Sequence, residues 1–172
     1  MKNDLTIIIA HYKLENSKLI NPLLKTLEKI SLQKNNYNIE VIIADDGSNY
    51  SKDILENFSK KIIIKNDKRN IYILKNSQLN NFLNKNNIKN DLIKSWVYLP
   101  KIIKCMSKAR VTNYAVKECT SDRILFLDDD NYFISKNTLK NTIDLFNKYD
   151  VIIGQIKDNN ERLRQYKSNR VQ

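Results

Sequence analysis

The sequence contains only two glycines, Gly47 and Gly154, among its 172 residues. A dinucleotide-binding loop of the form GxGxxG needs three glycines within one short turn, and a phosphate-binding loop of the form GxxxxGK[ST] needs two. Neither pattern can be written from this chain. The scarcity of glycine therefore excludes both the Rossmann dinucleotide site and the P-loop.

Cysteines and long apolar runs are also scarce. Cys105 and Cys119 have neither CxxC nor metal-site spacing, so we expect reduced thiols in the core of a cytoplasmic protein. No stretch reaches the ~18 apolar residues that a membrane span requires. The apolar run near the N-terminus is short and follows Asp4, which does not fit a signal peptide.

Positive charge is abundant. The chain has 30 Lys+Arg against 19 Asp+Glu, a formal net charge of +11. Such a surface attracts nucleic acid, anionic lipid headgroups or phosphorylated small molecules. Lys, Asn and Ile are frequent throughout, however, as an AT-rich coding sequence would also produce, so the charge alone leaves the function open.

Short apolar runs alternate with helical patterns along the chain. The runs predict strands at 5–10, 41–44, 62–64, 71–74, 124–127 and 151–153. Helical spacing predicts helices from Pro22 after an Asn21 cap, from a Ser51 cap, over 101–119 and over 138–149. The Asn- and Lys-rich residues 75–95 are expected to form a long, mobile surface segment. The alternation predicts one α/β domain over 1–172, with a mostly parallel sheet flanked by helices.

Two acidic turns follow two of these strands: Asp45 and Asp46, and the run Asp128, Asp129 and Asp130. Parallel strands would bring both turns to one edge of the sheet, where carboxylates ~6 Å apart repel by about 3 kcal/mol at a dielectric constant near 20. A divalent cation would reverse that sign, since Mg²⁺ or Mn²⁺ takes one or two carboxylates plus water and phosphate. An acidic helix cap or a solvated turn is the alternative.

Three segments in order, LTIIIAHY, IEVIIADDGS and RILFLDDDN, resemble the motifs of family-2 glycosyltransferases with the GT-A fold. Those enzymes open with a strand of the form VSIIIPTYN, continue to an IVDDGS turn, and carry a metal-binding DxD after an ILFLD strand. The segment SKARVTNYAVKECTSDRILFL is similar to their helix of the form ARNxGIxxAxGEYILFL. The resemblance covers about residues 4–155 and implies a Rossmann-like GT-A domain. Little chain follows Asp130, which also implies a truncated acceptor-binding half.

The resemblance implies a site for a nucleotide-diphosphate-sugar, with a UDP-sugar as the first choice. Tyr12 would line the base pocket, Asp45 would bond the base with Asp46 beside it, and Gly47 would let the turn close. The only histidine, His11, is interpreted as a hydrogen-bonding loop residue. Ala10 departs from the Pro or Thr usual in the family, so no base contact is expected from it.

On the metal side, the resemblance implies that Asp130 holds Mn²⁺ or Mg²⁺, with Asp128 as a second ligand. Asp128 or Asp129 would contact the ribose. An extended backbone would point Asp128 and Asp130 one way and Asp129 the other. Arg110 would lie near the base or the phosphates from its helix.

The implied activity is a metal-dependent sugar transfer, with inversion, to a saccharide or lipid-linked acceptor, in the cytoplasm and at the inner membrane surface. Asp158 and Glu161 lie downstream, but neither is identified as the catalytic base. A donor-binding fragment without turnover is one alternative. A nucleic-acid-binding module is another, although an acidic edge without metal would repel phosphates, so nucleic acid is not an expected partner. A sugar nucleotidyltransferase would need a glycine-rich loop that is absent.

Overall fold

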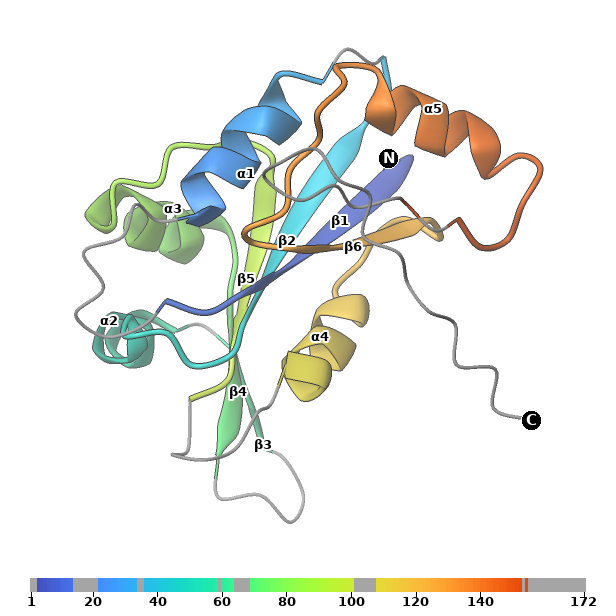
Figure 1. Ribbon diagram of the computed structural model, residues 1–172. Coiled ribbons are helices and arrows are strands. Elements are labelled where there is room, and N and C mark those ends of the chain that lie inside the picture. Colours follow the sequence, from blue (N-terminus) through green and yellow to red (C-terminus); the bar gives the residue numbers. More distant parts are fainter. Residues whose placement is uncertain are drawn as a thin grey trace.

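The computed structural model describes residues 3–13, 22–33, 36–58, 60–63, 69–100, 108–152 and 154. Strands and helices alternate over most of these residues, as the sequence predicts (Figure 1). In chain order the elements are β1 (Leu5–His11), α1 (Pro22–Ser31), β2 (Ile39–Asp45), α2 (Ser51–Asn57), β3 (Lys60–Ile63), β4 (Asn70–Leu74), α3 (Asn76–Lys85), β5 (Ile93–Tyr98), α4 (Lys108–Val116), β6 (Ile124–Asp128) and α5 (Thr138–Leu145).

The strands form one six-stranded sheet in the order β3-β4-β5-β2-β1-β6. The four strands β5, β2, β1 and β6 run parallel to one another, whereas β4 pairs antiparallel with β5 and β3 antiparallel with β4. The prediction of a mostly parallel α/β sheet flanked by helices is confirmed.

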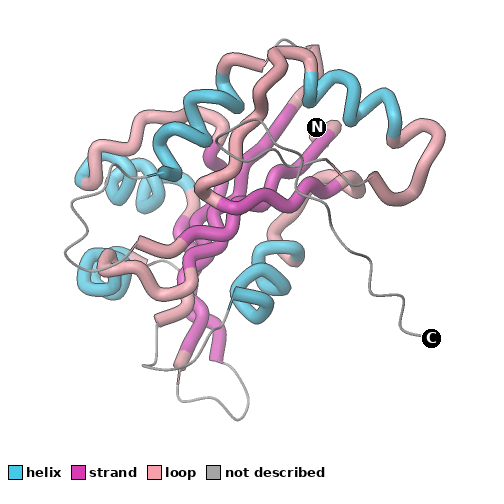
Figure 2. Tube along the Cα trace, in the orientation of Figure 1, coloured by secondary structure: helices cyan, strands magenta, loops and turns pink. Residues whose placement is uncertain are grey.

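Both faces of the sheet are covered, and this explains the continuous apolar runs in β1 and β2. Alternate residues of a strand point to opposite faces. Ile7 and Ile9 join the core that α1, α2, α3 and α5 complete. Ile8 points the other way, where Val111 and Ala115 of α4 pack against it. Figure 2 shows the same division among the described helices, with α4 on the side of the sheet opposite α1.

The prediction of a mobile surface segment over 75–95 is wrong. Residues 76–85 form α3, whose Leu79, Phe82 and Leu83 are buried, and β5 begins at Ile93 between β4 and β2. The Asn and Lys residues of α3 occupy mainly its exposed side, so they mask the helical spacing of its three buried residues. In such a helix the overall composition reflects the exposed residues, whereas the spacing of the apolar residues indicates the helix.

Several predicted boundaries also change. Tyr50, and not Ser51, holds the N-cap position of α2. Val151 and Ile152 are not in a strand, α5 ends at Leu145, and Cys119 is a free, half-buried thiol. Predictions for Asn21, Ile64, 101–107 with Cys105, Ile153, Asp158 and Glu161 lie outside the described residues.

None of the described helices is long and apolar enough to span a lipid bilayer.

The carboxyl ends of the parallel strands meet at one edge of the sheet, which we call the carboxyl rim. Ala10 of β1 pairs with Ala44 on one side and with Asp128 on the other. His11 pairs with Asp45, which in turn pairs with Tyr98 of β5. The two acidic turns therefore lie on the same rim, as predicted. In open α/β sheets this is where ligands bind.

Candidate functional site

The turn after β2 is built around the carboxylate of Asp45, which is fully buried. Its Oδ1 accepts a hydrogen bond from the Ser48 backbone N–H at 2.8 Å, and its Oδ2 accepts one from Trp96 Nε1 at 3.1 Å. Gly47 adopts a φ of 85°, a conformation that side chains with a Cβ rarely take. Asp45 is therefore an internal anchor for the turn. The direct base contact expected of it does not fit this structure.

Burial raises the pKa of Asp45 above its usual value, while His11 and the hydrogen bonds from Ser48 and Trp96 oppose the shift. When the pKa of a carboxyl is higher in the folded than in the unfolded protein, the group stabilises the fold at a pH below its unfolded-state pKa. That stabilisation is lost as the pH rises through the folded-state pKa. Asp45→Asn does not titrate at this position. We expect the wild type to gain free energy of unfolding, relative to Asp45→Asn, as pH falls from 7, by at most about 1.4 kcal/mol per pH unit. Urea denaturation at a series of pH values measures this, and parallel profiles would contradict it.

Two residues at this end of the rim are accessible. The ring of Tyr12, directly after β1, is 37% exposed. Asp46 is half-buried, and its backbone N–H donates to the His11 carbonyl at 2.9 Å. Both therefore lie at the carboxyl rim, and Asp46 is the less buried carboxylate of the first turn, although its Oδ1 is buried.

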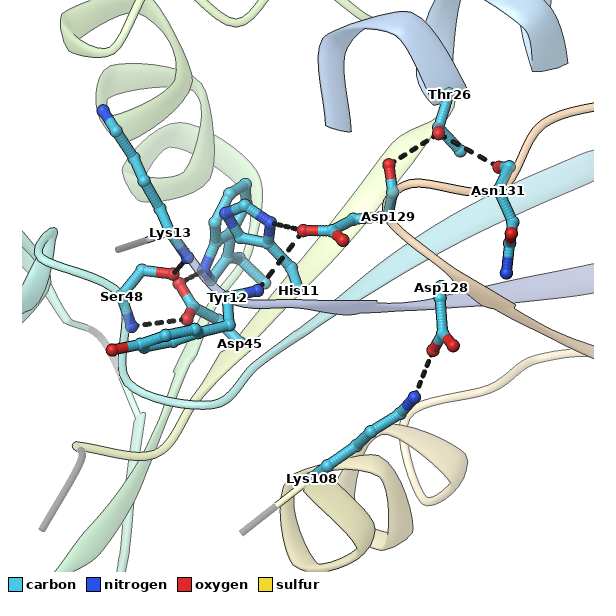
Figure 3. Close-up of polar contacts among 11 residues, drawn as sticks. His11, Tyr12, Lys13, Thr26, Asp45, Ser48, Lys108, Asp128, Asp129 and Asn131 are labelled. Atoms are coloured by element: carbon cyan, nitrogen blue, oxygen red, sulfur yellow. Dashed lines mark hydrogen bonds and ion pairs between the residues drawn. The ribbon is translucent and has the colours of Figure 1, made fainter. Parts of the chain in front are cut away.

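The three aspartates at the end of β6 do not form one cluster. A hydrogen bond of 3.1 Å from the Asn131 N–H to the Asp128 carbonyl closes a turn over Asp129 and Asp130. Asp128 and Asp129 point in different directions, Asp128 toward Lys108 and Asp129 toward His11 (Figure 3). Asp130 lies in the turn and is exposed. Its direction is therefore set by the turn and not by an extended strand.

Asp129 points inward to His11. The His11 Nδ1 lies 2.6 Å from Asp129 Oδ2, and the same oxygen accepts the Tyr12 backbone N–H at 3.3 Å (Figure 3). His11 is the last residue of β1 and is buried, so it is part of the sheet and not a loop residue. The Asp129 side chain is 17% exposed, whereas that of Asp128 is 46% exposed, so Asp128 is the more accessible of the two to a ligand.

Asp128 points to the other side of the rim and pairs with Lys108 at the start of α4 (Figure 3). Arg110 is exposed and lies two residues further along α4, about 200° around the helix from Lys108. The structure places Lys108 beside Asp128, and a position of Arg110 near the base or the phosphates stays a prediction. The sequence shows only that both are basic, because their roles depend on how α4 is rotated against β6.

The described residues contain no group of three or more His, Cys, Asp or Glu side chains that could hold a metal ion. A cation held by protein ligands alone does not fit this rim. Mg²⁺ and Mn²⁺, however, commonly take one or two carboxylates and complete their coordination with water and substrate phosphates. The exposed Asp130 fits that pattern, and Asp128 can join it by exchanging Lys108 for the cation.

The chain was compared with known proteins. The family model for glycosyl transferase family 2 matches residues 6–83 and 104–171. The two matched ranges contain nearly all of β1, both acidic turns and α4. A search of curated proteins finds no match to the chain.

Proposed function

The chain belongs to glycosyl transferase family 2, and on this premise we propose that its carboxyl rim binds the nucleoside diphosphate of a sugar donor together with a divalent cation. Family membership implies transfer of a sugar from a nucleotide donor to an acceptor. One structural observation supports the finer proposal. Two acidic turns, far apart in the chain, meet at the rim where an α/β sheet binds ligands.

Tyr12 and Asp46 form the base side of the proposed site. The exposed ring of Tyr12 offers a face for stacking. When ionised, the Asp46 carboxylate accepts hydrogen bonds, so it could accept an N–H of the base, such as that of uracil. Asp45 stabilises the turn that carries Asp46 by accepting hydrogen bonds from Ser48 and Trp96. The resemblance to the family makes a UDP-sugar the proposed donor.

Asp130, Asp128 and Lys108 form the diphosphate side. Asp130 would hold Mn²⁺ or Mg²⁺, and Asp128 would bind the ribose or the same cation. The bound cation supplies a Lewis acid that neutralises charge on the leaving diphosphate. Lys108, once released from Asp128, adds a positive charge next to the phosphates.

In the proposed reaction, an acceptor hydroxyl oxygen bonds to the anomeric carbon while the bond from that carbon to the diphosphate oxygen breaks. The hydroxyl proton passes to a carboxylate base. A single displacement of this kind inverts the anomeric configuration. No described residue is assigned as the base. A saccharide or lipid-linked acceptor, and a cytoplasmic location at the membrane surface, belong to the same proposal.

We expect UDP to stabilise the chain more in Mn²⁺ than in EDTA, because the cation joins Asp130 to the diphosphate. A ligand at one hundred times its Kd adds about 2.7 kcal/mol to the free energy of unfolding. Thermal denaturation with UDP, UMP and uridine, each with and without Mn²⁺, measures the effect, and UMP and uridine should show less of it. Equal stabilisation in Mn²⁺ and EDTA would contradict the metal bridge. DNA binding that falls steeply with salt and ignores Mn²⁺ would favour the nucleic-acid alternative instead.

A further inference from the structure

We propose that His11 is a positioning residue: it holds the Asp129 carboxylate inward, away from the cation that Asp130 would hold, and keeps that carboxylate in place as the acceptor of the Tyr12 N–H. The proposal rests on the proposed function, since it concerns how the same rim is held in its binding geometry. We call the contact of His11 Nδ1 and the Tyr12 N–H with Asp129 Oδ2 the His11 clamp.

The main chain of the aspartate turn is held separately from its side chains. The Asp129 N–H donates to the Ala10 carbonyl at 3.1 Å. The Thr26 hydroxyl donates to the carbonyls of Asp129 and Asn131, at 2.7 and 3.0 Å (Figure 3). These bonds bring the turn to the end of β1. These main-chain bonds do not fix the direction of the Asp129 carboxylate.

The Asp129 carboxylate is held toward His11, and His11 itself is tightly packed. Its side chain is 1% exposed. The ring stacks on Tyr50 at 6.1 Å between centroids and meets the edge of Trp96 at 5.7 Å. The His11 carbonyl accepts the Asp46 N–H, so the residue is also tied to the other acidic turn. A donor fixed in this way can hold the Asp129 carboxylate in one place.

Packing alone does not explain a histidine at this position. Because the Asp129 carboxylate is a hydrogen-bond acceptor, Nδ1 carries the proton that it receives. The other ring nitrogen, Nε2, is buried and has no hydrogen-bond partner among the described residues. A buried polar atom without a partner is unfavourable, and a phenylalanine ring would fill the same space without it. The property that distinguishes histidine here is therefore its Nδ1–H group.

Without the clamp, the Asp129 carboxylate is free to turn outward between Asp128 and Asp130. An outward Asp129 carboxylate adds a third negative charge at the rim, which repels the anionic diphosphate and competes with the phosphates for the cation. The Tyr12 N–H loses its acceptor at the same time. Loss of the clamp therefore disturbs both the cation side and the base side of the site.

Two variants separate positioning from packing. His11→Asn places an amide N–H near the position of Nδ1 but removes the ring, whereas His11→Phe keeps a ring and removes the donor. We expect His11→Asn to keep the Mn²⁺-dependent affinity for UDP within about threefold. We expect His11→Phe to lose about 10- to 100-fold, the range typical of mutations in the hydrogen-bonded shell around a metal site. Isothermal titration with UDP, in Mn²⁺ and in EDTA, measures both.

Urea denaturation of the same proteins gives the readout for packing, and there we expect the reverse order, with His11→Phe the more stable variant. A His11→Phe protein that binds UDP in Mn²⁺ with the affinity of the wild type overturns the proposal. If His11→Phe does not fold, His11→Leu, which also lacks a donor and is closer to histidine in size, replaces it, and the same loss of affinity is expected. Wild-type affinity in His11→Leu likewise overturns the proposal. If the wild-type protein binds UDP equally in Mn²⁺ and in EDTA, the result contradicts the metal-dependent proposed function. That result is distinct from the loss or retention of affinity in the His11 variants.

Discussion

Asp130→Asn is expected to remove the Mn²⁺-dependent part of UDP binding and to leave the metal-free protein at least as stable as the wild type. Asparagine keeps the size of the side chain but not the charge that a divalent cation needs. Asp130 is the exposed carboxylate of its turn, while Asp128 pairs with Lys108 and Asp129 with His11. We expect a loss of about 100-fold in affinity in Mn²⁺, roughly 2.7 kcal/mol.

Stability distinguishes this role from a structural one. If the aspartates repel one another in the metal-free protein, removing one charge relieves the repulsion. If Asp130 instead caps a helix or stabilises the turn, the same change costs ~0.3–1 kcal/mol. Asp91→Asn is the matched control, because Asp91 is also exposed but precedes β5 at the opposite edge of the sheet. A less stable Asp130→Asn protein that still binds UDP in a Mn²⁺-dependent way would exclude the metal-binding role.

Trp96→Ala is expected to produce the largest loss of stability, about 3–5 kcal/mol, the usual cost of truncating a buried tryptophan. Trp96 of β5 is 0% exposed. Its ring lies 4.9 Å from Phe82, and 5.7 Å from both Tyr50 and His11, measured between centroids. The cavity left by alanine would therefore open directly beneath the carboxyl rim.

Trp96→Phe separates packing from hydrogen bonding. Phenylalanine fills most of the space but cannot donate to Asp45, whose Oδ2 then lacks its partner, at a cost of about 1–3 kcal/mol. Trp96 is the only tryptophan, so far-UV circular dichroism in urea should follow unfolding in place of fluorescence. Tyr149→Ala, at a side chain that is 57% exposed, should change stability by no more than about 0.5 kcal/mol. A Trp96→Phe protein that is as strongly destabilised as Trp96→Ala would contradict the view that Trp96 stabilises the fold mainly by packing.

The sequence by itself determined the fold class and the location of the site. Parallel strands buried on both faces need continuous apolar runs, and residues 5–10 and 41–44 show such runs. The carboxyl ends of parallel strands share an edge, so the two acidic turns could be placed together without a structure. The scarcity of glycine excluded the other common nucleotide-binding loops. All of these inferences follow from local sequence and the general geometry of sheets.

Only the tertiary structure decided the partner of each carboxylate. His11 and Asp129 are 118 residues apart, and Trp96 and Asp45 are 51 apart, so neither pair has a local signal. Lys108 reaches Asp128 because of how α4 is rotated on the sheet. The sequence also did not reveal β5, whose central place follows from pairing with β2 and β4. The partner of each carboxylate depends on strand register and on the rotation of helices against the sheet. Long-range packing sets both, and the identity of a single residue does not encode them.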